Sequence, residues 1–420
     1  MKGKMRVFFV LLIVGLFTPT HALSQGMSTE EIIKELRILK GKITKLEAEL
    51  AKKDQEIERL KAESVKREEI EEVVEGMKSS EGPLAGGIQE HIYFSGLIEL
   101  GAARESVNNR DGTDKSQSDP ALTTVELSVD AEVNKWVNAG ITLLFEDPIS
   151  GDESDFSIDE GTVTIGNTEK FPFFCTGGAM YVPFGALLTH FPDDPLVDQP
   201  LTLLLGETRE KAVLVGFEYS GFNLSGYVFN GDIDEANSEN HIEHFGFDAN
   251  YEYANEGNGL ELLIGASYIN SIAEADAFTD ALAELGTTEL RDYVGGFDAY
   301  LHLAYSNLFF AGEYMTAIND FQPTELATGT GAGARPSVWN LEAGFNWDWG
   351  RNLEVAFKYA GSDESENLGF PENRFGLGLN QTIFEGVIAS LAFLHDEFDE
   401  NDRDGRDDRD VVFGQIAIEF

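Results

Sequence analysis

The sequence is short of cysteine, of positive charge and of long apolar runs. Its single cysteine, Cys175, excludes an intramolecular disulfide and a cysteine-rich metal site. Its 420 residues include 30 lysines and arginines against 75 aspartates and glutamates, a formal net charge of −45. Such acidity excludes nucleic acid as a partner, because phosphate binding needs a basic surface. It suits a protein that attracts cations.

One apolar run, Val7 to Phe17, follows three basic residues near the start of the chain. Small residues at Ala22 and Ser24 then offer a cleavage site, so residues 1–24 are predicted to be a signal peptide. An uncleaved anchor is the alternative, but the run is shorter than the roughly 20 residues of a spanning helix. No later run approaches that length, so the exported chain is expected to be either soluble or a β-barrel.

Residues 25–78 have a helical pattern. Ser28 and Glu31 have the spacing of a capping box, and apolar residues then recur in alternating steps of four and three, interrupted at Lys53. The narrow apolar stripe favours a self-associating coiled coil over a single helix packed on a core. A homotrimer would suit three barrels side by side. The glycine- and proline-containing residues 79–89 are predicted to be a linker.

From Glu90 onward the apolar period drops to two, in sixteen segments of about ten residues, the length of a tilted membrane-spanning strand. The predicted strands are 90–101, 122–133, 135–146, 156–166, 172–183, 210–219, 221–230, 241–253, 259–270, 293–305, 308–318, 337–349, 351–360, 372–380, 385–395 and 410–420. A soluble β protein is the alternative, but it rarely repeats so many strands of this length with so polar an inner face.

Short connections such as "YSGF" at 219–222 alternate with long polar ones, including 102–121, 184–209, 271–292 and 396–409. Outer-membrane barrels show this alternation, with brief periplasmic turns and extended outer loops. The sequence therefore predicts an all-β transmembrane barrel of about 16 antiparallel strands over 90–420, preceded by a short α-helical coiled coil. The expected location is the bacterial outer membrane. An even strand count would place the coiled coil and the C-terminus in the periplasm.

Alternation also assigns charged side chains to the interior of the barrel. In "TTVELSVDAEV", Leu127 would face lipid, whereas Glu126 and Asp130 would face the lumen. The predicted lumen-facing set is Glu126, Asp130, His244, Asp248, Glu252, Asp298, His302, Glu313, Glu342, Asp348, Lys358 and Arg374. It is either a hydrated wall or a selectivity region that favours cations because acids dominate. The two histidines could also help to hold a metal chelate.

Sixteen strands enclose an aqueous lumen. The connection after the fifth predicted strand contains the apolar stretch "LTLLLG", so it is expected to fold back into the lumen and narrow it. The predicted constriction residues are Pro183, Phe184, Gly185, Glu207, Thr208, Arg209 and Glu210. The residues before the first strand are too few and too helical to form a globular plug.

No enzyme signature is present. The seven histidines show neither a metalloprotease spacing nor a neighbouring nucleophile elbow, so a lipase or protease barrel is disfavoured and no cofactor is expected. In the last long connection, Glu400, Asp402 and Asp404 precede Gly405 with part of the spacing of a calcium loop. Val411 stands where that loop needs an acid, so solvated charge is the alternative to a surface calcium site.

Two stretches carry a family resemblance: "MYVPFG" at 180–185 and "QPLTLLLGETREKAVLVGFEYSGFNLSGYVFNGD" at 199–232. They resemble the LbtU-type siderophore porin family. Two departures are Gln199, where an acid looks usual, and "FPDDPLVD" at 191–198. The resemblance implies uptake of a ferric siderophore through a plugless sixteen-stranded barrel. A general or cation-preferring diffusion porin for other small polar solutes, and a structural porin that tethers the envelope, are the alternatives.

The last stretch, "DVVFGQIAIEF", alternates to its end. Val412, Ile416, Ile418 and Phe420 are predicted to face lipid, with Gln415 and Glu419 toward the lumen. This strand is expected to pair with the first one and close the barrel within outer-membrane lipid. A terminal aromatic on such a strand also resembles the signal that barrel assembly machinery reads.

Overall fold

The structure is a computed structural model that describes residues 91–147, 155–190, 192–194, 196–236, 241–255, 257, 259–287, 289–348 and 351–420, with Asp155 and Asp348 described by their backbone alone. The predicted signal peptide, coiled coil and linker lie outside these residues. Within the described ranges, no helix has the length and apolarity to cross a membrane.

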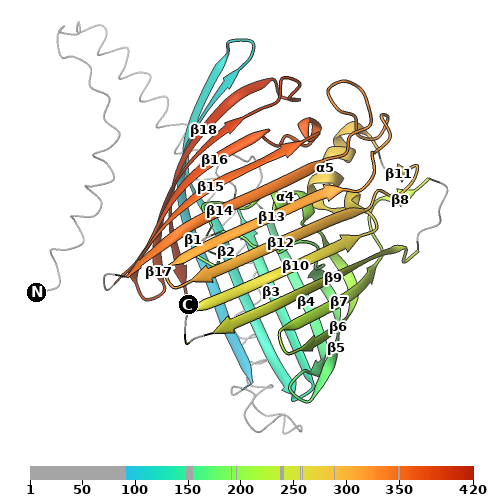
Figure 1. Cartoon of the computed structure of the whole chain (residues 1–420), viewed down its shortest axis with the longest axis vertical. Coiled ribbons are helices and arrows are strands. Elements are labelled where there is room, and N and C mark those ends of the chain that lie inside the picture. The colour runs from blue at the N-terminus through green and yellow to red at the C-terminus, as the bar shows by residue number, and fades with distance from the viewer. Residues whose placement is uncertain are drawn as a thin grey trace, which may run out of the picture. The chain divides into compact units, whose positions relative to one another are not determined.

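Sixteen antiparallel strands form one closed barrel, which confirms the predicted fold (Figure 1). The barrel strands are β1 (Ile92–Asn109), β2 (Asp114–Asn134), β3 (Val137–Glu146), β4 (Asp155–Asn167), β5 (Phe171–Tyr181), β6 (Arg209–Tyr219), β7 (Phe222–Phe229), β9 (His244–Asn255), β10 (Leu260–Ile269), β12 (Gly296–Tyr305), β13 (Leu308–Ala317), β14 (Ser337–Asp348), β15 (Asn352–Asp363), β16 (Asn373–Phe384), β17 (Val387–Glu397) and β18 (Arg406–Glu419).

Side chains alternate across the barrel wall as the sequence predicts. On β14, Leu341, Phe345 and Trp347 are exposed on the outer face, whereas Asn340 and Glu342 are buried inside. A pleated strand points successive side chains to opposite faces, so the outer face is apolar and the inner face carries the polar groups.

The first and last strands close the barrel. Ile98 of β1 lies opposite Ile418 of β18, and Gly96 and Phe420 exchange two backbone hydrogen bonds of 2.9 and 3.0 Å. On β18, Ile416 is exposed and Gln415 is buried, the predicted faces. Closure pairs the two edges that an open sheet would leave unsatisfied in lipid.

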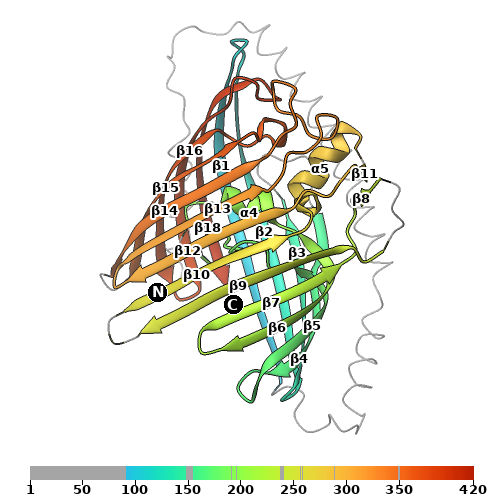
Figure 2. The ribbon, with the colours of Figure 1, turned by 45° about the vertical axis from the view of Figure 1, so that its right-hand side comes forward.

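Short turns gather at one end of the barrel and long connections at the other (Figure 2). At the short-turn end, Ser220 and Gly221 both have positive φ, 53° and 83°, as a two-residue type I′ hairpin requires. At the other end, the predicted loop 102–121 is wrong, because β1 and β2 continue as a paired hairpin as far as Asn108 and Asp114. This stretch is polar on both faces, so it has no alternation to reveal a strand.

Short elements occupy the long connections. They are α4 (Leu201–Gly206), β8 (Asp234–Glu235), η2 (Ile272–Glu274), α5 (Asp276–Leu285), β11 (Glu289–Leu290) and η3 (Glu366–Leu368), with β8 and β11 paired in parallel. The predicted loop 271–292 therefore contains a helix. This helix, α5, ends at Gly286, whose φ of 75° allows the left-handed C-cap.

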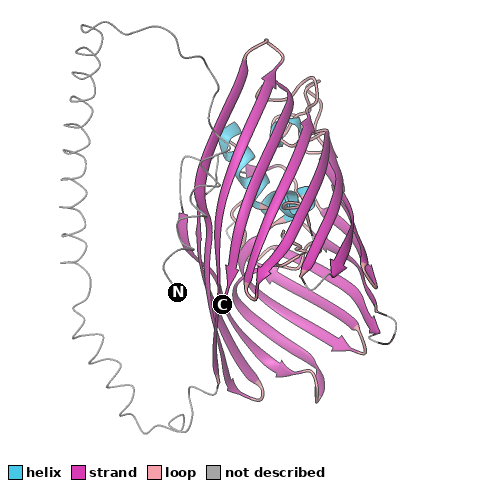
Figure 3. Cartoon of the chain, turned by 90° about the vertical axis from the view of Figure 1, so that its left-hand side faces the viewer, coloured by secondary structure: helices cyan, strands magenta, loops and turns pink. Residues whose placement is uncertain are grey.

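An apolar core lies inside the barrel, on the side of β6 to β14. It joins inward side chains of the wall, such as Ile269 and Met315, to Phe184, Leu205 and Phe278 of the connections, all nearly inaccessible. Figure 3 shows the helices, in cyan, behind the near strands, and Figure 2 shows α5 at the end of the barrel that carries the long connections. The connections supply this apolar surface, so part of the lumen is packed rather than filled with water.

Candidate pore constriction

Residues 182–208, here called the lumen segment, connect β5 to β6 through the interior of the barrel. The first anchor of this segment is on β10 and β13. Gly185 donates its N–H to Ser267 Oγ over 2.8 Å, and Ala186 donates to Glu313 Oε1 over 2.7 Å. A Cβ at Gly185 would lie 3.0 Å from Glu313 Oε1, and φ there is 90°, so glycine suits this close approach.

Glu313 also holds the far end of the segment. Its second carboxylate oxygen accepts a short hydrogen bond from the Thr202 hydroxyl in α4. Glu313 is buried, so each of its two hydrogen bonds replaces water that the carboxylate has lost. One side chain thus fixes both the beginning and the end of the lumen segment.

The second anchor is on β14, β15 and β16. Asp198 pairs with Lys358 Nζ and, over 2.9 Å, with Arg374 Nη1. Val197 donates its N–H to Glu342 Oε2 over 2.8 Å. Strands β15 and β16 lie halfway round the closed strand order from β5 and β6. The lumen segment therefore crosses the barrel from wall to wall.

A third contact is made by His190. Its Nε2 lies 3.4 Å from Glu99 Oε1 on β1, and Gln415 of β18 donates a short hydrogen bond to the same carboxylate. Burial disfavours a charged ring, but the hydrogen bond and negative charge of Glu99 outweigh it and raise the pKa of His190 above its usual value.

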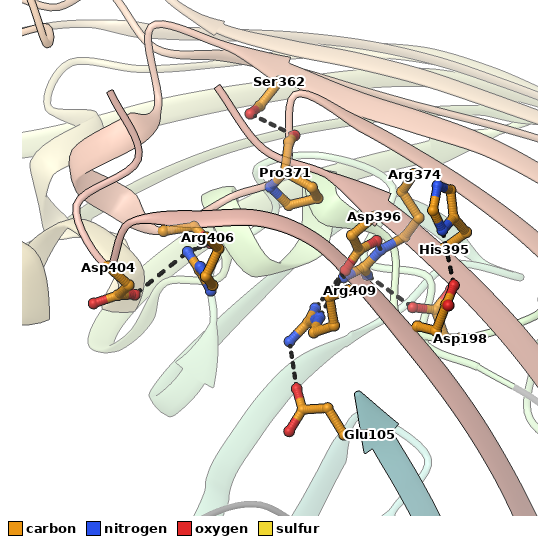
Figure 4. A network of polar contacts seen from close by, with 12 residues as sticks. Glu105, Asp198, Ser362, Pro371, Arg374, His395, Asp396, Asp404, Arg406 and Arg409 are labelled. Atoms are coloured by element: carbon orange, nitrogen blue, oxygen red, sulfur yellow. Dashed lines mark hydrogen bonds and ion pairs between the residues drawn. The ribbon is translucent and has the colours of Figure 1, made fainter. Parts of the chain in front are cut away.

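A ladder of alternating charges continues from Asp198 along the wall (Figure 4). Arg374 Nε and Nη2 bind the two oxygens of Asp396 over 2.7 and 3.0 Å. Arg409 Nε and Nη2 bind Asp396 Oδ2 over 2.9 and 2.5 Å, and Arg409 Nη1 reaches Glu105 over 3.2 Å. Two guanidinium groups thus compensate one fully buried carboxylate, and Glu105 completes the ladder on β1.

One cavity, the outer cavity, lies between the lumen segment and the walls β1–β3 and β16–β18. Its volume is about 510 Å³. The charged lining comprises five acids, two arginines and a histidine: Glu99, Glu105, Asp119, Glu146, Asp198, Arg374, Arg409 and His190. Leu204, Leu394, Val411 and Phe413 add an apolar part.

A second cavity, the inner cavity, reaches the short-turn end and has a volume of about 780 Å³. The lumen segment contributes Leu188, Asp194 and Leu196 to its wall. Among the described residues that line it there are five acids and no lysine or arginine: Glu169, Asp194, Glu218, Glu252 and Glu261. The segment therefore separates a cavity of mixed charge from an acidic one.

Three of the predicted constriction residues are buried in the lumen segment, whereas Glu207 lies at the C-terminal end of α4. Phe184 and Gly185 are buried and anchor the segment, and Pro183 lies between Phe184 and the buried Val182. Thr208 is also buried, and its hydroxyl donates a hydrogen bond to the backbone carbonyl of Gly206. Glu207 caps α4 at its C-terminal end. Burial, then the nearby Asp276, raises the pKa of Glu207 to about 7.

Arg209 and Glu210 lie at the start of β6, where the lumen segment ends. Arg209 occupies the outward register of β6, alternating with the exposed Val213 and Val215, and its Nη1 lies 3.4 Å from Asp159. Glu210 takes the inward register beside it and is half-buried. The sequence pattern places the segment in the lumen but gives no register for a residue at the end of a strand.

The predicted lumen-facing residues mostly lie on the inner face. Those that are buried there are Asp248, Asp298, Glu313, Glu342, Lys358 and Arg374. Glu252 lines the inner cavity, Asp130 lines a small cavity beside Asn138, and Glu126 accepts a hydrogen bond from Ser128. The side chain of Asp348 lies outside the described residues.

The two predicted chelate histidines do not meet. His244 begins β9 and lies 3.4 Å from the buried Glu274 at the outer end of the barrel. His302 lines the inner cavity and lies six residues beyond Gly296 on β12. Gly296 of β12 and Gly246 of β9 both pair with Ile269 of β10, so these two glycines lie at one level. His244 lies two residues from Gly246 in the opposite direction, so the offset is eight residues, or roughly 26 Å along the strands at about 3.3 Å per residue.

At the candidate calcium loop, two of the three acids contact an arginine. Asp402 binds Arg406 Nη2 over 2.7 Å, and Asp404 Oδ2 lies 3.4 Å from the same nitrogen (Figure 4). Glu400 is exposed and makes no third contact with them among the described interactions. Hydrogen bonds to Arg406 lower the pKa of Asp402 despite its burial. No group of three potential metal ligands was found within the described residues.

Several residues of the site, including Glu99, Asp198, Asp396 and Arg409, are absent from the predicted set. Glu99 belongs to the first predicted strand but was not assigned to the lumen, and Asp198 lies in the stretch that departs from the siderophore porins. Asp396 and Arg409 fell in the predicted loop 396–409, whereas β17 and β18 include both. Their alternating charges offered a signal, because opposite charges that face each other on paired strands stabilise a sheet.

The fold is that of bacterial outer-membrane porins. Pseudomonas putida OprB matches 81% of this chain and 96% of its own, with a TM-score of 0.54 at 8% identity. An anion-selective porin from Comamonas acidovorans matches 78% of this chain and 99% of its own, with a TM-score of 0.50 at 12% identity. Salmonella typhi OmpF has a TM-score of 0.50 at 11% identity, over 78% of this chain and 97% of its own.

Relatives by sequence are proteins designated UPF0422. One from Coxiella burnetii is 27% identical over 275 residues, which cover 64% of this chain and 57% of the relative. One from Legionella pneumophila strain Lens is 27% identical over 328 residues, 73% of this chain and 59% of the relative. The chain therefore spans less than two thirds of the length of these relatives. No family model matches the sequence.

Proposed function

We propose that this protein is an outer-membrane porin that passes small polar solutes and prefers cations. The observation that carries the proposal is the lumen segment, fixed to both walls, with water-accessible cavities of about 510 and 780 Å³ beside it. A segment held in this way narrows a sixteen-stranded lumen without filling it.

The preference for cations follows from the charges beside the segment. The described lining of the inner cavity has five acids and no lysine or arginine, and acids outnumber arginines in the outer cavity. Charge of one sign along a water-filled lumen with low-dielectric walls focuses the field and raises the local concentration of counter-ions. Cations would therefore enter more readily than anions of equal size.

Uptake of a ferric siderophore is the finer hypothesis, and it rests on the sequence resemblance alone. The departures from that family, Gln199 and residues 191–198, lie in the lumen segment, and Asp198 is its main anchor to the wall. The stretch that would contact a specific ligand is thus the stretch in which this sequence differs from the siderophore porin pattern. We therefore rank general passage of small polar solutes first, with a periplasmic coiled coil, a homotrimer and an envelope-tethering role as further hypotheses.

Liposome swelling with the full-length protein tests the proposed function. Uncharged sugars of increasing size should enter at rates that fall smoothly with size, and small organic cations should enter faster than anions of equal size. Saturable entry of one ferric chelate, with exclusion of small sugars, would replace this proposal by the siderophore hypothesis. Vesicles that stay impermeable to every solute would contradict both.

A further inference from the structure

The outer cavity changes character along its length. At its outer end, Arg409 and Arg374 meet on Asp396, and Arg409 extends to Glu105. At its inner end, the strand register places Glu99 of β1, Thr124 of β2 and Glu146 of β3 at one level. The cavity therefore has a guanidinium end and a carboxylate end.

An apolar belt lies between the two ends. Val411 pairs with Glu105 on one side and Leu394 on the other, and Phe413 pairs with Ala103 one step further in. Leu204 of α4 lines the same cavity from the lumen segment. A solute in contact with this belt would bury apolar groups, whereas its two ends would meet charge.

Arg409 has N–H donors left for a further partner besides Asp396 and Glu105. A guanidinium carries five N–H donors, and the described contacts of Arg409 use its Nε, one Nη1 and one Nη2 position. About 23% of its side chain is exposed, and it lines the outer cavity. A carboxylate is the natural partner for the remaining donors, because charge-assisted hydrogen bonds to guanidinium are strong and directional.

We propose that the outer cavity is a binding site for short zwitterionic peptides, with the peptide carboxylate at Arg409 and the ammonium group at Glu146, on the level of the buried Glu99. This inference deepens the proposed function, since it names a solute class for the same lumen. The register gives the size: Glu99 and Glu105 are six residues apart on β1, or about 20 Å. The side chains of Arg409 and of the acids extend into the cavity, so the distance between their charged groups is shorter than about 20 Å. An extended peptide of three to five residues spans about 10–18 Å, which fits this shorter distance.

Calorimetric titration of the detergent-solubilised full-length protein with alanyl-leucyl-alanine tests the site without relying on conduction. The free peptide should bind saturably, and its C-terminal amide and N-acetyl forms should each bind roughly tenfold more weakly. Equal binding of the amide and the free acid would overturn the assignment to Arg409. Absence of any heat at saturating peptide would overturn the site as a whole.

Variants sharpen this test. Arg409→Gln should weaken the free peptide roughly tenfold and leave the amide unaffected, because the amide has no carboxylate to lose. Arg104→Gln is the matched control, since Arg104 is an exposed arginine on the outward register of β1, beside Glu105. Glu146→Gln should weaken both forms of the peptide. Equal loss in the Arg104 and Arg409 variants, or tighter competition by a ferric chelate than by peptide, would contradict the proposal.

The outcome is separable from that of the proposed function. A channel that conducts with a preference for cations but binds no peptide would keep the porin proposal and remove the site. Peptide binding by a protein that passes no ions would keep the site and remove the porin proposal.

Discussion

The two cavities beside the lumen segment use charge in opposite ways. In the outer cavity, Asp198, Arg374, Asp396, Arg409 and Glu105 are joined in one ladder, so most of the charge is compensated within the protein. In the inner cavity, five acids face the lumen, and no lysine or arginine is among the described lining residues. Paired charges hold the structure in place and bind solute groups through directed hydrogen bonds. Unpaired charges of one sign determine whether cations or anions enter.

Asp198 holds the lumen segment to the wall of the barrel through Lys358 and Arg374, so removing its carboxylate should have the largest effect. Asp198→Ala leaves the buried Lys358 and Arg374 with one fewer partner and releases the lumen segment from the wall. We expect a loss on the order of 3 kcal/mol in unfolding free energy and a several-fold rise in single-channel conductance. Urea unfolding and planar-bilayer recordings measure the two effects.

Asp193→Asn is the matched control for that change, because Asp193 is exposed on the same segment. It should leave conductance and stability close to those of the native protein. Equal conductance in the Asp198 and Asp193 variants would show that the ion pairs at Asp198 do not hold the constriction.

The inner cavity should govern selectivity. Replacing Glu218, Glu252 and Glu261 together by glutamine removes three of its five acids and keeps the shape of the side chains. The ratio of potassium to chloride permeability should fall several-fold with little change in conductance. Reversal potentials across a salt gradient measure this ratio. The equivalent change of Glu105 alone should have a weaker effect, because Arg409 already compensates it.

Two carboxyls in the connections should make stability depend on pH. Burial is the main cause that raises the pKa of Glu207 and of Glu274 to about 7. Between about pH 4.5 and pH 7 the folded protein then binds protons that the unfolded chain releases, so stability should fall as pH rises through this range. Unfolding midpoints measured across it test the sign. The double variant Glu207→Gln, Glu274→Gln should flatten the slope, and an unchanged slope would contradict the assignment.

The smallest effect is expected at the last long connection. Arg406 there binds Asp402 and lies over the ring of Phe398, with its guanidinium carbon 4.0 Å from the ring centre. Arg406→Gln should cost about 2 kcal/mol, because it removes charge-assisted hydrogen bonds to Asp402, whose carboxylate keeps the backbone N–H donors of Asp404 and Arg406. Calcium should not restore the midpoint of thermal unfolding. Restoration by calcium would revive the predicted metal loop.

The sequence predicts the barrel better than it predicts the site. Alternation and turn residues place all sixteen strands, because lipid on one face and water on the other impose a strict period of two. The signal fails where neither condition holds. The hairpin of β1 and β2 is polar on both faces, so its pattern predicts a loop where the two strands in fact stay paired.

The site depends on contacts between distant parts of the chain. Asp198 meets Lys358 and Arg374 only because the lumen segment crosses the barrel. The apolar "LTLLLG" stretch predicts that the segment folds inward, but not which wall it reaches. That choice is made by buried charge pairs, and a single sequence does not show which acids and bases are partners.

The reversal potential of the unmodified, full-length protein in a planar bilayer, across a gradient of potassium chloride, tests the central claim most directly. If the lumen prefers cations, potassium crosses faster than chloride, and the dilute side becomes positive relative to the concentrated side. The cation preference also predicts that the inner-cavity triple variant moves the potential toward zero. A potential of the opposite sign, or one that the triple variant leaves unchanged, would contradict the account.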